Sequence, residues 1–148
     1  MNRELVKDLF LSLLIVLSQL LIFNHINLFG TVSTFIYVSL FILYKTTYDK
    51  TYLILFGFIV GLIIDLSLQT YGAHTLASIT VCYLKERIEK YSFGVNSTLP
   101  LAMIRGTQLT NRVTYFFLII FLHSLIYFSL IFFKFEFTLT IFLYTLIN

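Results

Sequence analysis

The sequence predicts an all-α integral membrane protein with five to six transmembrane helices and a cytoplasmic N-terminus. Of its 148 residues, 59% are hydrophobic and only 11% are charged, and the mean hydropathy is +0.93. Soluble domains have about 25% charged residues, so this chain has too few charges to cover a water-soluble globule. Several apolar runs also approach the ~20 residues that a membrane-spanning helix requires. Nothing in the composition points to nucleic-acid binding.

The distribution of charge predicts how these helices are oriented. One multi-pass domain is expected over residues 1–148, with spans at about 9–23, 26–44, 52–68, 73–90, 113–133 and 137–148. Nine of the ten Lys and Arg residues fall at the N-terminus or in the second and fourth connections, and only Lys134 falls on the other side. Because cytoplasmic loops are enriched in Lys and Arg, both chain ends are expected in the cytoplasm.

The spans differ in how well they fit a bilayer. The first follows Arg3 and Lys7 without a small-residue cleavage site, so it is expected to be a retained helix. The second and third are separated by the charged stretch KTTYDK, and the segment 91–112, which contains Pro100, is expected to be the one long loop. The apolar part of the fourth, residues 73–84, would reach only ~18 Å, so its helix must continue into KERIEKY. The last run is also short, and it is either a half-span or a helix that the chain end truncates.

The third and fourth spans have polar or small residues at every fourth position, and these predict a tightly packed antiparallel hairpin. They are Gly57, Gly61, Asp65 and Gln69, then His74, Ser78 and Cys82. Residues at this spacing share one face of a helix, and small residues on such a face let helix backbones approach closely in lipid. A turn at residues 69–72 would pair Asp65 with His74, Gly61 with Ser78, and Gly57 with Cys82. Chance occurrence of this glycine spacing is the alternative interpretation.

Asp65 is the residue most indicative of a site. A carboxylate in an apolar span costs roughly 2.5 kcal/mol or more unless it has a partner or water, so Asp65 is expected to accept hydrogen bonds from His74 or from N–H groups of the turn, with Gly72 permitting the backbone geometry. A structural role in the hairpin is favoured over proton or ion handling, because no second acidic residue is expected at that depth. His25 and His74 are expected near the outer face and His123 mid-span, so no metal site is predicted.

Two further features bear on function. The basic run KERIEK is expected to be a solvated helix end with Glu86 paired to Lys90, and the alternative is that Lys85, Arg87 and Lys90 form a docking face for a cytoplasmic partner. No nucleophile is spaced with a histidine and an acid, and no metalloprotease motif occurs. No enzymatic activity and no cofactor are therefore predicted.

The run FGFIVGLIIDLSLQTYGAHTLASITVCYL resembles the signature of MreD, the rod shape-determining membrane protein family of bacteria. The matching elements are Gly61, Leu62 and Asp65, then Gly72 and His74, with Ala77 and Tyr83 at positions that are similar in the family. The stretch QLLIFNHINLFG and His123 are similar to the Bacteroidota-type branch. Prolines that related sequences often have near positions 34 and 45 are replaced here by Thr34 and Lys45.

This resemblance implies a non-enzymatic, multi-pass component of the cell-elongation machinery in the bacterial inner membrane. The implied partners are MreC and, through it, the MreB filament, RodA and a class B penicillin-binding protein that act in peptidoglycan synthesis. The family's fold is similar to the six-helix substrate-binding subunits of energy-coupling-factor vitamin transporters. A small-molecule-binding transporter subunit is therefore the alternative function, and it would require a polar pocket lined by residues such as Asp65, His74, Gln69 and Asn24.

Overall fold

The computed structural model describes residues 3–25, 27–28, 32–44, 49–94, 107–133 and 138–147. These residues are helical except for one short strand pair and its connections, in which Asn27 pairs with Ser33 and Leu28 with Val32. The elements in chain order are α1 (Arg3–Leu21), η1 (Phe23–His25), β1 (Asn27–Leu28), β2 (Val32–Ser33), η2 (Ile36–Val38), α2 (Ser39–Leu43), α3 (Lys50–Leu68), α4 (Ala73–Phe93), α5 (Leu109–Phe132) and α6 (Thr138–Ile147).

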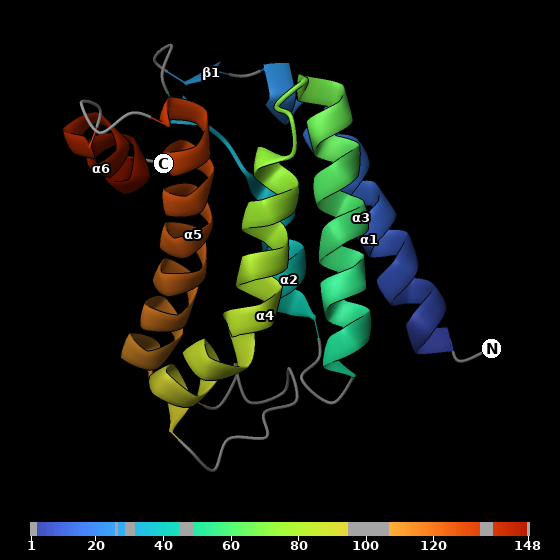
Figure 1. Cartoon of the computed structure of the whole chain (residues 1–148). Helices are drawn as coiled ribbons and strands as arrows, with labels where there is room; N and C mark the ends of the chain where they lie inside the picture. Colours follow the sequence, from blue (N-terminus) through green and yellow to red (C-terminus); the bar gives the residue numbers. More distant parts are fainter. Residues whose placement is uncertain are drawn as a thin grey trace.

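The long helices run side by side, and their ends fall at two opposite ends of the molecule (Figure 1). The first residues of α1, α3 and α5 and the last residues of α4 lie at the lower end in this view. The α3–α4 turn and the strand pair lie at the upper end. Helix α4 packs between α3 and α5, while α1 packs against α3. This alternation places the start of α1 and the last turns of α4, which carry the basic run, at the same end.

Five of the six predicted helices are present among the described residues, as α1, α3, α4, α5 and α6. Helix α3 extends the predicted span 52–68 by two residues because the Asp49 carboxylate caps its first turn, accepting a 2.8 Å hydrogen bond from the Thr51 amide. The same bond lowers the pKa of the Asp49 carboxyl. Helix α4 continues through the charged run to Phe93, so the predicted extension of the fourth span is confirmed. Among the described residues, α3 and α5 are long and apolar enough to cross a membrane.

The prediction of a continuous helix over residues 26–44 is wrong. Helical structure begins only at Ile36 and ends at Leu43, and the strand β2 (Val32–Ser33) precedes it. The cause is visible in the sequence VST at residues 32–34, because the β-branched Val and Thr lose side-chain freedom in a helix and the Ser and Thr hydroxyls compete for backbone hydrogen bonds. The segment 32–44 nevertheless runs from the upper end to the lower end, behind α4 (Figure 1).

The C-terminal run forms a helix as predicted, but it is short. Helix α6 has ten residues, about 15 Å of length, and lies beside the upper part of α5 (Figure 1). The Tyr144 ring contacts the rings of Phe128 and Phe132, with 5.6 Å between centroids in both pairs. The described part of α6 therefore corresponds to a half-span.

The predicted loop 91–112 is shorter than expected, because α4 ends at Phe93 and α5 begins at Leu109, and residues 95–106 lie outside the described residues.

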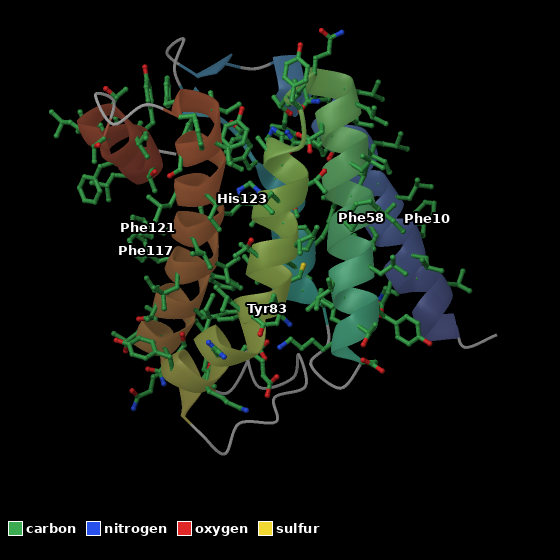
Figure 2. All side chains as sticks on the ribbon, viewed as in Figure 1. Phe10, Phe58, Tyr83, Phe117, Phe121 and His123 are labelled. Carbon is green, nitrogen blue, oxygen red and sulfur yellow. The ribbon has the colours of Figure 1, made fainter. Side chains whose placement is uncertain are left out.

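The core joins η2 and α2 to α1, α3, α4 and α5. Its largest fully buried apolar and aromatic members are Tyr37, Phe41, Ile64, Tyr115 and Ile119. The outward faces are also apolar: Phe10 on α1 and Phe117 on α5 are 67% and 53% exposed, and both side chains point away from the bundle (Figure 2). A wide apolar exterior of this kind is stable in lipid rather than in water.

Candidate functional site

The α3–α4 turn has an unusual backbone. Gln69 ends α3 in the left-handed conformation with φ of 55°, Tyr71 has φ of 51°, and Gly72 has φ of 94°. The Asp65 carbonyl accepts hydrogen bonds from the amides of Gln69 and Thr70, which ends the helix. Only Gly72 adopts such a positive φ without a steric penalty. The predicted tight turn at residues 69–72 is therefore confirmed, together with the proposed role of Gly72.

The Asp65 carboxylate accepts four hydrogen bonds from the turn and the start of α4. Oδ1 accepts from the Thr70 hydroxyl at 2.5 Å and from the His74 amide at 3.0 Å. Oδ2 accepts from the Thr75 amide at 2.8 Å and from the Thr75 hydroxyl at 2.5 Å. Asp65 is only 5% exposed, so each oxygen exchanges water for two protein donors. We call these groups the Asp65 cluster.

The Asp65 cluster works as a helix cap supplied by another helix. Gly72 occupies the N-cap position of α4 and has no side chain to accept the first free amides. His74 and Thr75 are the second and third residues of α4, whose amides have no partner within their own helix. Asp65 on α3 supplies the missing acceptor, and its negative charge also suits the positive end of the α4 dipole. The prediction that backbone N–H groups of the turn bind Asp65 is confirmed.

Both glycines of α3 permit close contact with α4, although the predicted register holds for only one of them. A methyl group at Gly57 would lie 2.6 Å from Cys82 Sγ, which agrees with the predicted pair. A methyl group at Gly61 would lie 2.5 Å from Thr75 Cα and 3.0 Å from the His74 carbonyl oxygen. Gly61 therefore faces the backbone of the first turn of α4 rather than Ser78. The Asp65 cluster draws this turn toward α3, which explains the difference.

The side chain of His74 has a partner that the sequence did not indicate. The Tyr37 hydroxyl lies 2.9 Å from His74 Nδ1 and 2.6 Å from His123 Nε2, and all three residues are 0% exposed. The expectation that His74 and His123 lie apart is wrong, because η2 places Tyr37 between α4 and α5. Figure 2 shows His123 on the side of α5 that faces α4. The side chain of His25 lies outside the described residues.

Aromatic rings enclose the two histidines. Phe35 meets both imidazoles edge-on, with centroid distances of 5.2 Å to His74 and 5.3 Å to His123. Tyr127 stacks on His74 at 4.3 Å. Two buried ring nitrogens of this group have no hydrogen-bond partner among the described residues: His74 Nε2 and His123 Nδ1. Ser78, predicted to face Gly61, is buried instead next to the Tyr37 hydroxyl, with which it interacts.

The Gln19 side chain on α1 forms hydrogen bonds with backbone groups before and within η2. Its amide nitrogen donates to the Thr34 carbonyl at 3.0 Å and to Asn24 Oδ1 at 2.9 Å, and its oxygen accepts from the Tyr37 amide at 3.2 Å. Non-helical backbone at membrane depth requires such shielding by protein groups. Sequence reasoning missed this role. The available signal was an amide side chain inside the apolar run of the first span.

The three cations of the run KERIEK differ in how exposed they are. The predicted pair of Glu86 with Lys90 is confirmed at 2.6 Å, and both are exposed. Lys85, however, is 2% exposed and cannot belong to a docking face, which corrects that assignment. Its ammonium donates to the Tyr44 carbonyl at 2.7 Å and lies 3.0 Å from Glu89 Oε1.

Glu89 connects the buried Lys85 side chain to α5. It is 6% exposed, and the Tyr115 hydroxyl donates to its Oε1 at 3.2 Å. Lys85, Glu89, Tyr115 and the Tyr44 carbonyl therefore connect α2, α4 and α5 near the lower end of the bundle. A buried ion pair is tolerated when further hydrogen bonds satisfy both partners, and here each partner has one.

Among the described residues, no group of three or more His, Cys, Asp or Glu side chains is arranged to hold a metal ion. Comparison of the chain with protein-family models, with curated proteins and with solved structures found no match. The resemblance to MreD therefore depends on the residues of the α3–α4 hairpin. Structurally, those same residues form the Asp65 cluster and the close helix contact at Gly57 and Gly61.

Proposed function

We propose that the chain is a non-enzymatic membrane scaffold of the bacterial cell-elongation complex, which binds an MreC-like protein through its transmembrane helices. The observation that carries this proposal is the engagement of Asp65. All four of its carboxylate hydrogen bonds hold α3 to the start of α4, so this buried carboxylate stabilises a helix hairpin. A carboxylate with this many partners has little capacity left to bind a ligand, which favours the scaffold over a transporter subunit.

The proposal includes a multi-pass topology in the inner membrane, with the lower end of the bundle in the cytoplasm and five to six crossings as in the substrate-binding subunits of vitamin transporters. The exposed apolar side chains of α1, α3 and α5 support contact with lipid. The second crossing would be the partly extended segment 32–44, which is shielded by α1 and α4. Cysteine labelling tests this topology, because Tyr71 at the upper turn is fully exposed. In a Cys82→Ser background, a cysteine at position 71 should react with an impermeant thiol reagent added outside intact spheroplasts, and one at Lys90 should not.

Co-purification from native membranes tests the function. The tagged chain, extracted in mild detergent, should recover an MreC-like single-span protein, and with lower yield RodA, a class B penicillin-binding protein and MreB, which are expected to associate indirectly. Recovery of the energising module of a vitamin transporter would overturn the proposal in favour of the alternative. Recovery of neither set after chemical crosslinking in the membrane would also contradict it.

We also propose that Arg87 and Lys90, the exposed cations of the basic run, contribute to docking at the cytoplasmic face. Both lie on α4 at the lower end, where the partner's cytoplasmic segment would enter. The variant with Arg87→Glu and Lys90→Glu should reduce recovery of the partner severalfold. Lys7→Glu on α1 is the matched control, because Lys7 is an exposed cation near the same end and should leave recovery unchanged. Equal loss in both variants would indicate a general charge effect.

A further inference from the structure

Tyr37, His74 and His123 form a continuous hydrogen-bonded chain that the scaffold function does not use. The three side chains come from η2, α4 and α5, and each is 0% exposed. The central Tyr37 oxygen joins His74 Nδ1 and His123 Nε2 at 2.9 Å and 2.6 Å. The other nitrogen of each ring is buried and has no partner among the described residues. We call His74 Nε2 and His123 Nδ1 the outer nitrogens.

The number of hydrogens on the tyrosine hydroxyl determines how the chain can be protonated. A phenol has one hydrogen to donate, and a neutral imidazole has one donor and one acceptor nitrogen. A hydrogen-bonded chain through all three residues therefore requires Tyr37 to donate to one histidine and accept from the other, while the neighbouring Ser78 hydroxyl can donate to the second lone pair of the Tyr37 oxygen. No acidic side chain of the described part pairs with either ring, so both imidazoles are treated as neutral. Asp65 on α3, the acid that caps the start of α4, binds the His74 amide and not its ring.

This requirement couples the tautomers of the two histidines. His74 uses Nδ1 and His123 uses Nε2 toward Tyr37. If Tyr37 donates to His74, the hydrogens of both rings are on Nε2. If Tyr37 donates to His123, the hydrogens of both rings are on Nδ1. The two histidines must therefore hold the same tautomer, and a change in one requires a change in the other.

We propose that Tyr37, His74 and His123 constitute an internal proton-relay site, in which a proton taken up at one outer nitrogen is released from the other. Starting with both hydrogens on Nε2, a hydronium ion gives its proton to His123 Nδ1 and becomes water. The His123 Nε2 proton passes to the Tyr37 oxygen, the Tyr37 proton passes to His74 Nδ1, and the His74 Nε2 proton leaves to a second water. One proton enters and one leaves, so the chain returns to neutrality with both hydrogens on Nδ1.

The unpartnered outer nitrogens distinguish this site from the Asp65 cluster. A purely structural polar group is normally satisfied at every buried atom, because an unpaired buried donor or acceptor costs about 1–3 kcal/mol. The Asp65 carboxylate follows that rule, with four donors on two oxygens. The histidine chain has an open end at each ring instead. Intramembrane ionisable residues of this kind commonly serve in proton relays.

Nitrogen-15 NMR of the full chain in lipid nanodiscs, with labelled histidine, tests the proposal. A His25→Gln background leaves only the two relevant histidines, because the sequence has three. The expected spectrum contains two paired states, one with both rings protonated on Nε2 and one with both on Nδ1, and exchange spectroscopy should give both rings the same interconversion rate. In Tyr37→Phe the rates should separate at least tenfold. Tyr127→Phe is the matched control, because it removes a neighbouring hydroxyl without breaking the chain, and the common rate should persist.

Several results would overturn the relay. They are rings that hold different tautomers, a charged imidazole at neutral pH, and a single pair of tautomers that never exchanges. Unchanged coupling in Tyr37→Phe would equally exclude Tyr37 as the link. Melting profiles of both tyrosine variants confirm that the protein measured is folded, so a lost coupling reports the missing hydroxyl.

Discussion

Replacing Asp65 with asparagine changes the charge and one acceptor of the Asp65 cluster while keeping the shape of the side chain. Asparagine has a single acceptor oxygen, so its NH2 group must face either the His74 amide or the Thr75 amide, both of which are donors. One backbone hydrogen bond to a charged acceptor is lost, which costs about 1.5–3 kcal/mol. The remaining bond also weakens, because charge-assisted bonds are roughly twice as strong as neutral ones. Asparagine is neutral, so burying it costs less free energy than burying the Asp65 carboxylate, and this difference offsets part of the loss.

The expected net destabilisation is about 2 kcal/mol. At about 2–4 °C per kcal/mol for a chain of this size, the melting temperature should fall by about 4–8 °C. The chain has no tryptophan, but its single cysteine, Cys82, is 0% exposed at the α3–α4 contact. A maleimide dye that fluoresces on reaction with a thiol therefore reports separation of this hairpin during a thermal ramp in detergent.

Asp49→Asn is the matched control for this experiment. Asp49 also accepts a backbone amide at the start of a helix, but it is exposed and makes a single such bond. Its variant should shift the melting temperature less than Asp65→Asn does. The argument for the Asp65 cluster fails if Asp65→Asn melts within about 1 °C of the parent, or if the two variants shift equally.

Three further predictions concern the other contacts between helices. Gly61→Ala should greatly reduce recovery of monodisperse protein by size-exclusion chromatography, because the added methyl group meets α4 backbone, whereas Gly57→Ala should lose less because it meets a side chain that can rotate. Lys85→Met should destabilise the chain by about 3–5 kcal/mol in the dye assay, because the buried Glu89 carboxylate loses its partner. Lys90→Met, which breaks an exposed pair, should cost about 0.3–0.5 kcal/mol. Similar shifts in the two variants would refute the buried-pair assignment. Gln19→Leu should cost about 1–3 kcal/mol for each backbone group left unpaired, and an unchanged melting temperature would show that those groups do not depend on it.

Local patterns were enough to predict the long helices and the hairpin. Apolar length and charge predicted α3, α4 and α5, and the four-residue spacing from Gly57 to Asp65 predicted the face that meets α4. Gln69 to Gly72 predicted the turn. These features depend on residues that are close in sequence, so propensity and periodicity report them directly. The segment 26–44 failed this reasoning because hydropathy describes burial and not conformation, and Val32, Ser33 and Thr34 disfavour a helix although the segment as a whole is apolar.

Contacts between distant segments could not be predicted in the same way. The meeting of Tyr37 with His123 joins residues 86 positions apart. Each of these residues looks unremarkable within its own apolar run, and only the packing of η2 between α4 and α5 brings them together. A depth argument placed His74 near the outer face and His123 mid-span, but depth alone does not determine distance. In the structure the two imidazole rings lie side by side, with 6.2 Å between their centroids, and the Tyr37 hydroxyl contacts both.

Lys85 shows why composition misassigns individual members of a charged run. In KERIEK both lysines have a glutamate four residues away, so the sequence treats Lys85 and Lys90 alike. The structure separates them because successive residues of a helix point in different directions, and the direction of Lys85 is occupied by the α2 end and by Tyr115 on α5. Lys85 and Glu89 share that inward face, whereas Glu86 and Lys90 share the outward one. Glu89→Gln should therefore destabilise the chain far more than Glu86→Gln, although both glutamates lie four residues from a lysine partner.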